Sequence, residues 1–387
     1  MKIAIFADTF YPHLGGVEDS IALMASSLGA RGHRVDIYVP HIPTEEIDLG
    51  ENVFIHRFPS LRLPISIPAR LAYPTGKGWR LLRENRPDII HTHTIASMGL
   101  ESLLAARLLK LPMIGTNHSI VSEFTCYSPF APKLLGSIGS RYDAWFYNRG
   151  EHLTAPSQTV LTEMTKHGFG KSSHPISNPI DTETFKPNFE AKEKLKEFFG
   201  LAGRPVVSFA GRFALEKRVE IILRAIALVK EEIPNVALAL AGHGAEESKW
   251  RKLISELGLE DNVVFVGTLS KPELAKLFQS SDVFAIASPA ETQSMVALQA
   301  MACGIPVVGV NARALPEYVS EGETGYLVPV DDYELMAERI KNLLKNPELG
   351  LQLGLAGRLV ALRYSPQAIC EQWEEIYQEV INKYHGQ

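Results

Sequence analysis

The feature that most constrains this chain is an alternation of short apolar runs with amphipathic segments, which starts at the N-terminus and begins again after residue 200. This alternation is typical of βαβ units, whose strands are parallel. The runs that predict strands are 3–7, 35–39, 88–93, 113–116, 206–210, 236–241, 263–266, 283–287 and 307–310. The segments that predict helices are 17–29, 97–110, 219–232, 245–257, 271–278, 294–303 and 366–384. The fold class we expect is α/β, with two Rossmann-like doubly wound domains.

A chain of 387 residues fits two domains, since a domain usually takes roughly 100–200 residues. We place the boundary in 178–187, which is rich in turn-forming residues and has no apolar periodicity. The expected parts are an N-terminal domain over 1–180, a C-terminal domain over 181–365 and a final helical segment over 366–387.

The composition excludes several other classes of protein. Hydrophobic residues make up 45% and charged residues 21%, which is ordinary globular usage and argues against disorder or a collagen-like fibre. The net charge of −5 disfavours nucleic acid as a partner. The three cysteines lie far apart without metal-ligand spacing, and the N-terminus has no signal-peptide pattern, so we expect a cytoplasmic protein.

Gly15 and Gly16 follow the first predicted strand and precede a helix. Glycines at a helix N-terminus allow a phosphate to approach backbone N–H groups closely, and the helix dipole favours an anion there. The GxGxxG spacing of dinucleotide-binding proteins is missing, so NAD is disfavoured. A phosphate-binding turn and a plain connecting turn both stay open.

Two further turns carry charged side chains at predicted strand ends. Gly211, Arg212 and Lys217 follow the strand 206–210, and the two cations are suited to hold a leaving diphosphate without a metal. Glu291 follows the strand 283–287, and we expect the free N–H groups of 292–295 to face an anion while its carboxylate accepts sugar hydroxyls. The alternatives are a solvated surface pair for the cations and a simple helix-start acid for Glu291.

Gly15-Gly16-Val17-Glu18, Gly211-Arg212 with Glu216-Lys217, and Glu291 opening an E-x7-E-like stretch together resemble glycosyltransferase family 4 (group 1). The resemblance covers essentially the whole chain. It implies the GT-B fold, in which two Rossmann-like domains face a central cleft and the final helix crosses back to the first domain. It also implies transfer of a hexosyl group from a nucleotide sugar with retention of configuration.

The resemblance implies roles for single residues. The positions that match the catalytic residues are His118, Arg212, Lys217 and Glu291. The positions that match nucleotide-binding residues are Gly15, Gly16, Gly211, Gly242, Gly244, Val266, Gly267, Ser294, Met295, Val296 and Gln299. Gln299 departs from the family, which has a second Glu there to hold the ribose hydroxyls. An amide still donates and accepts hydrogen bonds, but the charge is lost.

The resemblance further implies that the first domain binds the acceptor and the second the donor, which we expect to be a UDP-hexose. We expect no cofactor and no metal, because no Asp-x-Asp lies where it would hold one. Arg57–Arg86 carries seven basic residues interleaved with apolar ones, which suits either an anionic membrane surface or a basic loop. We favour a membrane glycerolipid acceptor and peripheral attachment to the inner membrane face. A soluble sugar acceptor and a non-catalytic nucleotide-sugar-binding protein stay open.

His91 and His93 are spaced to share one face of a strand end. Two such histidines are able to bind zinc, but no third ligand presents itself nearby in the sequence. We therefore favour a strand end that lines the active-site cleft.

Overall fold

The computed structural model describes residues 1–387 except 13–14, 44–46, 63–69, 74–76, 119–131 and 387. The chain forms two compact units. Unit 1 combines Met1–Pro179 with the C-terminal segment Pro366–Gln387, and unit 2 is Ile180–Ser365. The break after Pro179 falls inside the turn-rich segment 178–187, because the chain there has no apolar periodicity that would commit it to either core.

Unit 1 contains a parallel sheet of seven strands in the order β3-β2-β1-β6-β7-β8-β9. Its strands are β1 (Lys2–Phe6), β2 (Arg34–Pro40), β3 (Val53–Phe58), β6 (Ile89–Thr92), β7 (Met113–Thr116), β8 (His152–Ala155) and β9 (Ser173–Pro175). A separate antiparallel pair is formed by β4 (Ser60–Arg62) and β5 (Arg70–Ala72). The four predicted strands of this half are confirmed within one or two residues at their ends, because they are the fully buried central strands.

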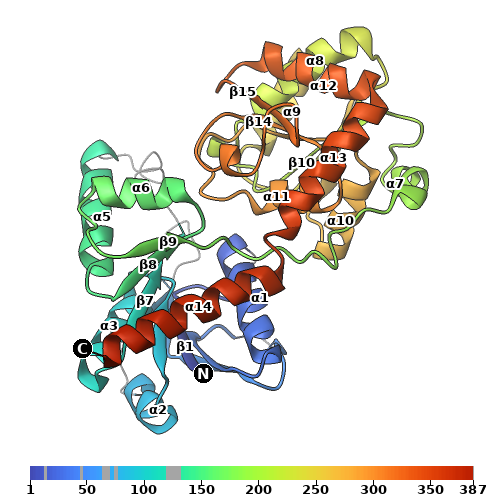
Figure 1. Ribbon diagram of the computed structural model, residues 1–387. Coiled ribbons are helices and arrows are strands. Elements are labelled where there is room, and N and C mark those ends of the chain that lie inside the picture. The colour runs from blue at the N-terminus through green and yellow to red at the C-terminus, as the bar shows by residue number, and fades with distance from the viewer. Residues whose placement is uncertain (13–14, 44–46, 63–69, 74–76, 119–131, 387) are drawn as a thin grey trace. The chain divides into compact units, whose positions relative to one another are not determined.

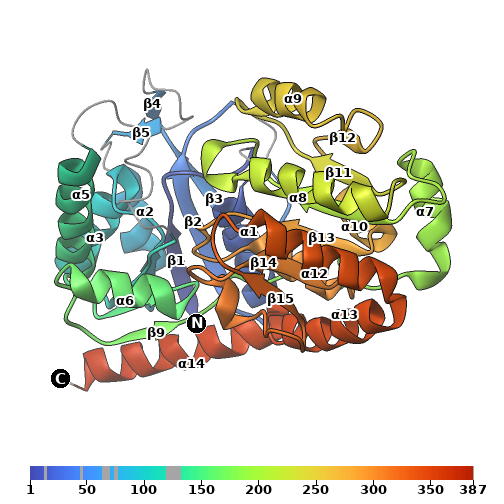
Figure 2. The same ribbon diagram turned by 90° about the horizontal axis from the view of Figure 1, so that it is seen from above.

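Helices cover both faces of this sheet. They are α1 (Gly16–Ala30), α2 (Lys77–Asn85), α3 (Ser97–Leu109), α5 (Pro132–Tyr147), α6 (Gln158–Lys166) and α14 (Pro366–His385). The connection from β1 to β2 runs across the sheet in the opposite direction from those between β6, β7 and β8. Right-handed crossovers therefore place α1 on one face and α3 and α5 on the other (Figure 2). The terminal helix α14 packs against α1.

Unit 2 contains a parallel sheet of six strands in the order β12-β11-β10-β13-β14-β15. Its strands are β10 (Val206–Ala210), β11 (Ala237–Ala241), β12 (Val263–Gly267), β13 (Val283–Ile286), β14 (Val307–Val310) and β15 (Gly325–Val328). Its helices are α7 (Lys192–Phe198), α8 (Val219–Glu232), α9 (Glu247–Glu256), α10 (Lys271–Ser280), α11 (Met295–Ala302), α12 (Tyr333–Lys345) and α13 (Pro347–Leu362). Figure 1 shows both sheets with their helices. The predicted helices 245–257 and 294–303 are each slightly longer than α9 and α11.

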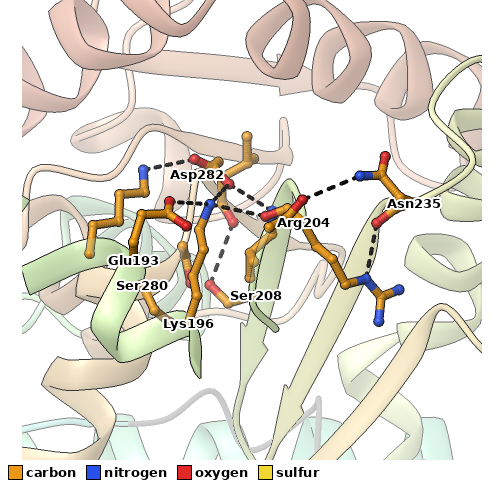
Figure 3. A network of polar contacts seen from close by, with 12 residues as sticks. Glu193, Lys196, Arg204, Ser208, Asn235, Ser280 and Asp282 are labelled. Atoms are coloured by element: carbon orange, nitrogen blue, oxygen red, sulfur yellow. Dashed lines mark hydrogen bonds and ion pairs between the residues drawn. The ribbon is translucent and has the colours of Figure 1, made fainter. Parts of the chain in front are cut away.

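A buried lysine ties α7 to the amino-terminal edge of the unit 2 sheet (Figure 3). Lys196 Nζ donates to the Arg204 carbonyl at 2.9 Å and lies 3.3 Å from Asp282 Oδ2. Asp282 also accepts from the Val206 N–H, at the first residue of β10, at 2.7 Å. This network lies at the edge opposite to the strand ends where ligands bind in such sheets.

Candidate functional site

The unit 2 site is built from loops that leave the carboxyl ends of β10, β11, β12 and β13 and are joined by hydrogen bonds. The Gly211 N–H donates to the Ala241 carbonyl at 3.0 Å, and the Gly242 N–H donates to the Gly267 carbonyl at 2.8 Å. His243 Nδ1 is 2.7 Å from Thr268 Oγ1, which joins the β11 and β12 loops through side chains. The loops that contain the predicted residues Gly211, Gly242 and Gly267 are therefore held in one cluster.

Lys217 and Glu291, 74 positions apart in sequence, form an ion pair with Nζ 2.6 Å from Oε1. The Glu291 side chain is 8% exposed, whereas the Lys217 side chain is 23% exposed. The pair brings together two of the predicted catalytic residues and fixes the lysine at the carboxyl edge of the sheet. Its partly exposed ammonium group is a positive charge available to an anion that approaches this edge.

Arg212 is the second cation of this edge. Its side chain is 64% exposed, and one guanidinium nitrogen donates to Glu216 Oε1 at 2.7 Å. The Glu216 side chain is 18% exposed, and it holds one terminal nitrogen of the guanidinium. The planar guanidinium has further donors for a phosphate group.

Two glycines permit backbones to approach closely behind these cations. A Cβ at Gly242, whose φ is +129°, would fall 1.9 Å from the Gly211 carbonyl oxygen. A Cβ at Gly244 would fall 2.3 Å from the Phe213 carbonyl oxygen. The predicted contact positions Gly242 and Gly244 therefore serve first to let the β11 loop pack against the β10 loop, at the Gly211 and Phe213 carbonyls.

The start of α11 differs from the sequence-based expectation. The N–H of Ser294 is not free for an anion, because it donates to the Tyr318 hydroxyl at 3.0 Å. Ser294 is 1% exposed, and its Oγ accepts from the Ala297 N–H as the helix N-cap. Ser294 therefore shapes the turn, and Met295 and Val296 supply the first N–H groups of the helix.

Gln299 lies in α11, and its buried Oε1 has no hydrogen-bond partner among the residues that the structure describes. The residue is 7% exposed. A buried acceptor without a donor costs free energy, so the position is suited to a ligand hydroxyl that would donate to it. Val266, the remaining predicted contact, lies in β12 and is half-buried.

The unit 1 site contains three histidines at the ends of β6 and β7. His118 Nε2 lies 2.8 Å from His93 Nδ1, and the two rings stack with centroids 5.1 Å apart. His93 in turn packs on His91, at 4.0 Å between centroids. His91 Nδ1 is 2.7 Å from the Tyr377 hydroxyl of α14, and its Nε2 is 2.6 Å from Thr116 Oγ1.

These imidazoles are neutral at physiological pH. Burial lowers the pKa of His118 to about 4, and burial lowers the pKa values of His91 and His93 well below the ordinary histidine value. A neutral His118 is suited to exchange hydrogen bonds with sugar hydroxyls, and its position is fixed by His93. Sequence reasoning singled out the His91–His93 spacing, but it missed the hydrogen bond to His118, because contacts between neighbouring parallel strands leave no local signal.

Other unit 1 residues are arranged around the same sheet edge. Asp8 Oδ1 accepts from Ser97 Oγ at 2.6 Å and from the Met98 N–H at 2.9 Å, so it caps α3. Gly15 and Gly16 begin α1, where a Cβ on Gly15 would lie 2.5 Å from a Glu18 carboxylate oxygen. Glu18 thus folds over the start of its own helix, as expected for a helix-start acid.

Asp143 of α5 is a residue that sequence reasoning missed. It is 3% exposed, no described residue donates to its Oδ1, and burial raises its pKa to about 7. No local pattern marks a single acid within a helix as buried, because its burial depends on the packing of α5 on the sheet.

Two doubly wound parallel sheets with charged and glycine-rich loops at their carboxyl edges define the GT-B architecture of nucleotide-sugar glycosyltransferases. Residues 191–360 match the family model of glycosyl transferases group 1, and residues 14–184 match that of glycosyltransferase family 4. The chain belongs to glycosyltransferase family 4, group 1.

Two curated relatives and one solved structure illustrate the likeness. The chain is 27% identical to alpha-monoglucosyldiacylglycerol synthase of Streptococcus pneumoniae, over 90% of this chain and 80% of that protein. It is 26% identical to a GDP-mannose-dependent alpha-mannosyltransferase of Mycolicibacterium smegmatis, over 99% and 98% of the two chains. The structure of Anabaena Alr3699/HepE in complex with UDP superposes with a TM-score of 0.80 at 21% identity, covering 98% of this chain and all of the other.

Within the described part of the chain, no helix combines the length and apolarity that a membrane-spanning segment requires.

Proposed function

We propose that this glycosyltransferase moves a hexosyl group from a UDP-hexose, held by unit 2, to a hydroxyl group of a membrane glycerolipid, with retention of configuration. The observation that carries the proposal is the Lys217–Glu291 pair, because it fixes a cation and a carboxylate beside a glycine-backed turn and close to Arg212.

The chemistry follows from the charges that develop during transfer. As the bond to the anomeric carbon breaks, the diphosphate gains negative charge and the sugar becomes oxocarbenium-like. Arg212 and Lys217 are cations held in place before the reaction, so they stabilise the leaving group without reorganisation. The Glu291 carboxylate accepts hydrogen bonds from hydroxyls of the transferred sugar while it orients Lys217. We propose that these cations allow transfer without a metal.

The donor and acceptor classes rest on the comparisons. The pneumococcal relative carries diacylglycerol in its name, which supports a glycerolipid acceptor. The Anabaena structure holds UDP, whereas the mycobacterial relative is named for GDP-mannose, so the donor base is the part of the proposal that needs a direct comparison. Unit 1, with His118 at its sheet edge, is the part that we assign to the acceptor and to the sugar at the reaction centre.

The test is to incubate the protein with UDP-glucose, UDP-galactose or GDP-mannose, with and without vesicles that contain diacylglycerol, and to measure the nucleoside diphosphate released. We expect release from a UDP-hexose that requires the vesicles and persists in EDTA, and NMR of the product should show the donor's anomeric configuration. Lys217→Ala should lower kcat by about 10²–10³, as expected for loss of one preorganised transition-state contact.

Each alternative gives a different result. If release of nucleoside diphosphate is the same with and without vesicles but increases with a soluble sugar, the acceptor is a soluble sugar. Binding of UDP-hexose without release in any condition would indicate a nucleotide-sugar-binding protein. An inverted product would overturn the retaining mechanism, and normal turnover in Lys217→Ala would overturn the assignment of the leaving-group site.

A further inference from the structure

Helix α3 presents leucines to solvent in a regular stripe. Leu100, Leu104 and Leu108 are 46%, 53% and 58% exposed. Their spacing of four residues places them on one side of the helix. The other exposed residues of α3 and its C-cap are two cations, Arg107 and Lys110. This side of the helix therefore combines three large apolar side chains with two cations.

Helix α5 continues the same kind of surface. Ile138, Tyr142 and Trp145 are exposed, and the Tyr142 and Trp145 rings stack at 5.5 Å between centroids. The guanidinium of Arg149 lies 3.6 Å above the Trp145 ring, and Arg141 is exposed beside them. Aromatic rings with a polar edge and nearby cations are typical of the boundary between lipid and water.

The two helices adjoin on one face of the unit 1 sheet (Figure 2). The Tyr142 hydroxyl donates to the Ile95 carbonyl just before α3, at 2.9 Å, and a Cβ at Gly99 would lie 3.2 Å from the Phe146 ring. We call this surface the α3–α5 face. Its residues are Leu100, Leu104, Arg107, Leu108, Lys110, Ile138, Arg141, Tyr142 and Trp145.

The α3–α5 face is uniformly positive among the side chains that the structure describes. The acid of α3, Glu101, is half-buried and turns toward α2, and burial raises the pKa of its carboxyl. The acid of α5, Asp143, is buried. The neighbouring α2 and β5 contact α3 and carry further arginines, the half-buried Arg70 and the exposed Arg80, which pairs with Glu84 of the same helix.

Charge decides between the occupants of this face. A second copy of the chain would bring arginines and lysines against one another, which opposes association. An anionic lipid surface attracts the cations and at the same time takes up the leucine and tryptophan side chains. We propose that the α3–α5 face is a docking surface for an anionic lipid bilayer.

This inference rests on the proposed function, because a lipid acceptor is what would make membrane docking useful. Binding of the face to a bilayer is nevertheless measured independently of sugar transfer. The inference also places the contact on two helices outside Arg57–Arg86, for which the sequence left an anionic membrane surface and a basic loop both open. Residues 63–69 and 74–76 of that stretch lie outside the described residues. Its described Arg70 and Arg80 lie on elements that contact α3, whereas α3 and α5 supply the apolar side chains.

Unit 2 offers a matched control. Helix α13 exposes Leu351, Leu355 and Leu359 with the same spacing of four residues. The one basic residue inside this helix, Arg358, donates to the backbone carbonyls of Phe185 and Ala302. Its C-cap Arg363 is exposed, but the exposed Glu348 of the first turn offsets that charge, so α13 has no net positive charge at its surface. If apolar exposure alone caused lipid binding, the α13 leucines would contribute as much as those of α3.

The experiment is vesicle flotation of the full chain with phosphatidylcholine vesicles that contain or lack phosphatidylglycerol. We expect binding that requires phosphatidylglycerol and weakens as salt is added. Leu104→Glu with Leu108→Glu should reduce the vesicle-bound fraction about tenfold or more, since it removes apolar contacts and adds repulsive charge. Leu355→Glu with Leu359→Glu should leave the bound fraction unchanged.

Circular dichroism and thermal unfolding establish that each variant is folded. If the Leu104→Glu, Leu108→Glu double variant does not fold, the alternative variant is Arg107→Glu with Lys110→Glu. It replaces two exposed side chains and should release the protein from the vesicles. Binding of the α3 variants equal to that of the wild type overturns the proposal. Equal binding of the wild type to neutral and anionic vesicles also overturns it. A third contrary result would be a wild-type dimer that forms without lipid and that dissociates in Leu104→Glu with Leu108→Glu, because the face would then bind a second copy of the chain. Vesicle binding without any sugar transfer would instead overturn the proposed function and leave the docking surface standing.

Discussion

Gln299 is a residue at which this chain departs from its family, and within the described part of the chain nothing donates to its buried Oε1. If this oxygen accepts a ribose hydroxyl of the donor, Gln299→Ala should raise KM for the nucleotide sugar about tenfold with little change in kcat. The reason is that the ribose contact is equally strong in the ground state and in the transition state. Steady-state kinetics with varied donor concentration measure both constants.

The companion variant for this position is Gln299→Glu. A carboxylate accepts hydrogen bonds from hydroxyls more strongly than an amide, so KM for the donor should fall below that of the wild type. An unchanged KM in Gln299→Ala would show that α11 holds the nucleotide without this side chain.

The buried histidines make the stability of unit 1 dependent on pH. Burial holds the pKa of His118 at about 4, below the ordinary value of 6.5. Below pH 6.5 the unfolded chain binds a proton that the folded chain does not, so stability is complete above pH 6.5 and is lost as pH falls toward 4. Each such histidine lowers the free energy of unfolding by about 1.4 kcal/mol for each unit by which the pH falls in this window.

Urea unfolding at several pH values between about 7 and about 5 measures this dependence. His118→Asn should have a shallower slope of unfolding free energy against pH than the wild type, whereas His243→Gln, at an exposed position, should keep the wild-type slope. Equal slopes in the wild type and His118→Asn would contradict the burial of a neutral imidazole.

The sequence located Lys217 and Glu291 as candidate residues because each follows a predictable buried strand, and it located His118 through the family resemblance. It did not predict which of them touch. The Lys217–Glu291 pair joins residues 74 positions apart, and its formation depends on β10 and β13 being neighbours in the sheet. Likewise the Tyr318 hydroxyl takes the Ser294 N–H, which no pattern near Ser294 indicates.

Among the structural elements, the turn after β11 has the least room. Gly242 has φ +129°, and a Cβ there would meet the Gly211 carbonyl oxygen at 1.9 Å. Gly242→Ala should therefore lower the free energy of unfolding by about 3 kcal/mol and displace the β10 turn that holds Arg212. Urea unfolding and donor KM measure the two effects.

Gly258→Ala is the matched control for the backbone conformation. Gly258 also has positive φ, +62°, but a Cβ there would meet no atom within 4 Å. Gly258→Ala should lower the free energy of unfolding by only about 1–2 kcal/mol, the penalty of the left-handed conformation, and leave the donor KM unchanged. Equal effects in the two variants would show that close packing of the two loops has no part in the cost.

The short helix α7 depends on the buried Lys196. Lys196→Ala removes the ammonium that lies between the Arg204 carbonyl and the Asp282 carboxylate. Loss of one member of a buried ion pair typically costs about 3–5 kcal/mol. Lys192 also pairs with Asp282, at 2.7 Å, so we expect a smaller loss of about 2–3 kcal/mol.

Urea unfolding of unit 2 measures this loss, and Lys194→Ala, at an exposed position of the same helix, should change stability little. Donor KM should stay unchanged in both variants, because the network lies at the edge of the sheet remote from the nucleotide. A Lys196→Ala protein as stable as Lys194→Ala would show that the buried pair contributes nothing net.

Which elements the sequence predicts depends on where they lie in each sheet. The central strands of both sheets are buried and mostly apolar, and all of them were predicted, as was the apolar edge strand β12. The strands that were missed lie at or near sheet edges: β3 and β9 are partly exposed, β8 contains two polar residues among four, and β15 begins with a glycine. The antiparallel pair β4–β5 was missed as well, since its strands are only three residues long.

In the whole molecule, the chain leaves unit 1 at Pro179, builds unit 2 and returns at Pro366. The returning helix α14 buries Trp373, Ile376 and Tyr377 in unit 1, and its Tyr377 hydroxyl contacts the histidine chain through His91. Glu374 pairs with Arg31 and His33, which follow the C-terminal end of α1. Unit 1 is therefore complete only when the last residues of the chain have docked.

This arrangement predicts that damage to α14 weakens unit 1 selectively. Trp373 is 3% exposed, so Trp373→Ala should lower the unfolding free energy of unit 1 by about 3–5 kcal/mol and leave unit 2 unchanged. Trp250, also 3% exposed, lies in the core of unit 2 and gives the reciprocal variant, Trp250→Ala. Hydrogen exchange read by mass spectrometry resolves the two units separately.

UDP adds a second distinction between the units, because a ligand stabilises only the part that binds it. UDP should slow exchange in the unit 2 loops after β10 and β13 in both the wild type and Trp373→Ala, since α14 has no part in that site. Faster exchange throughout unit 2 in Trp373→Ala would mean that the two units unfold together, and the terminal helix would then stabilise the whole enzyme instead of closing one core.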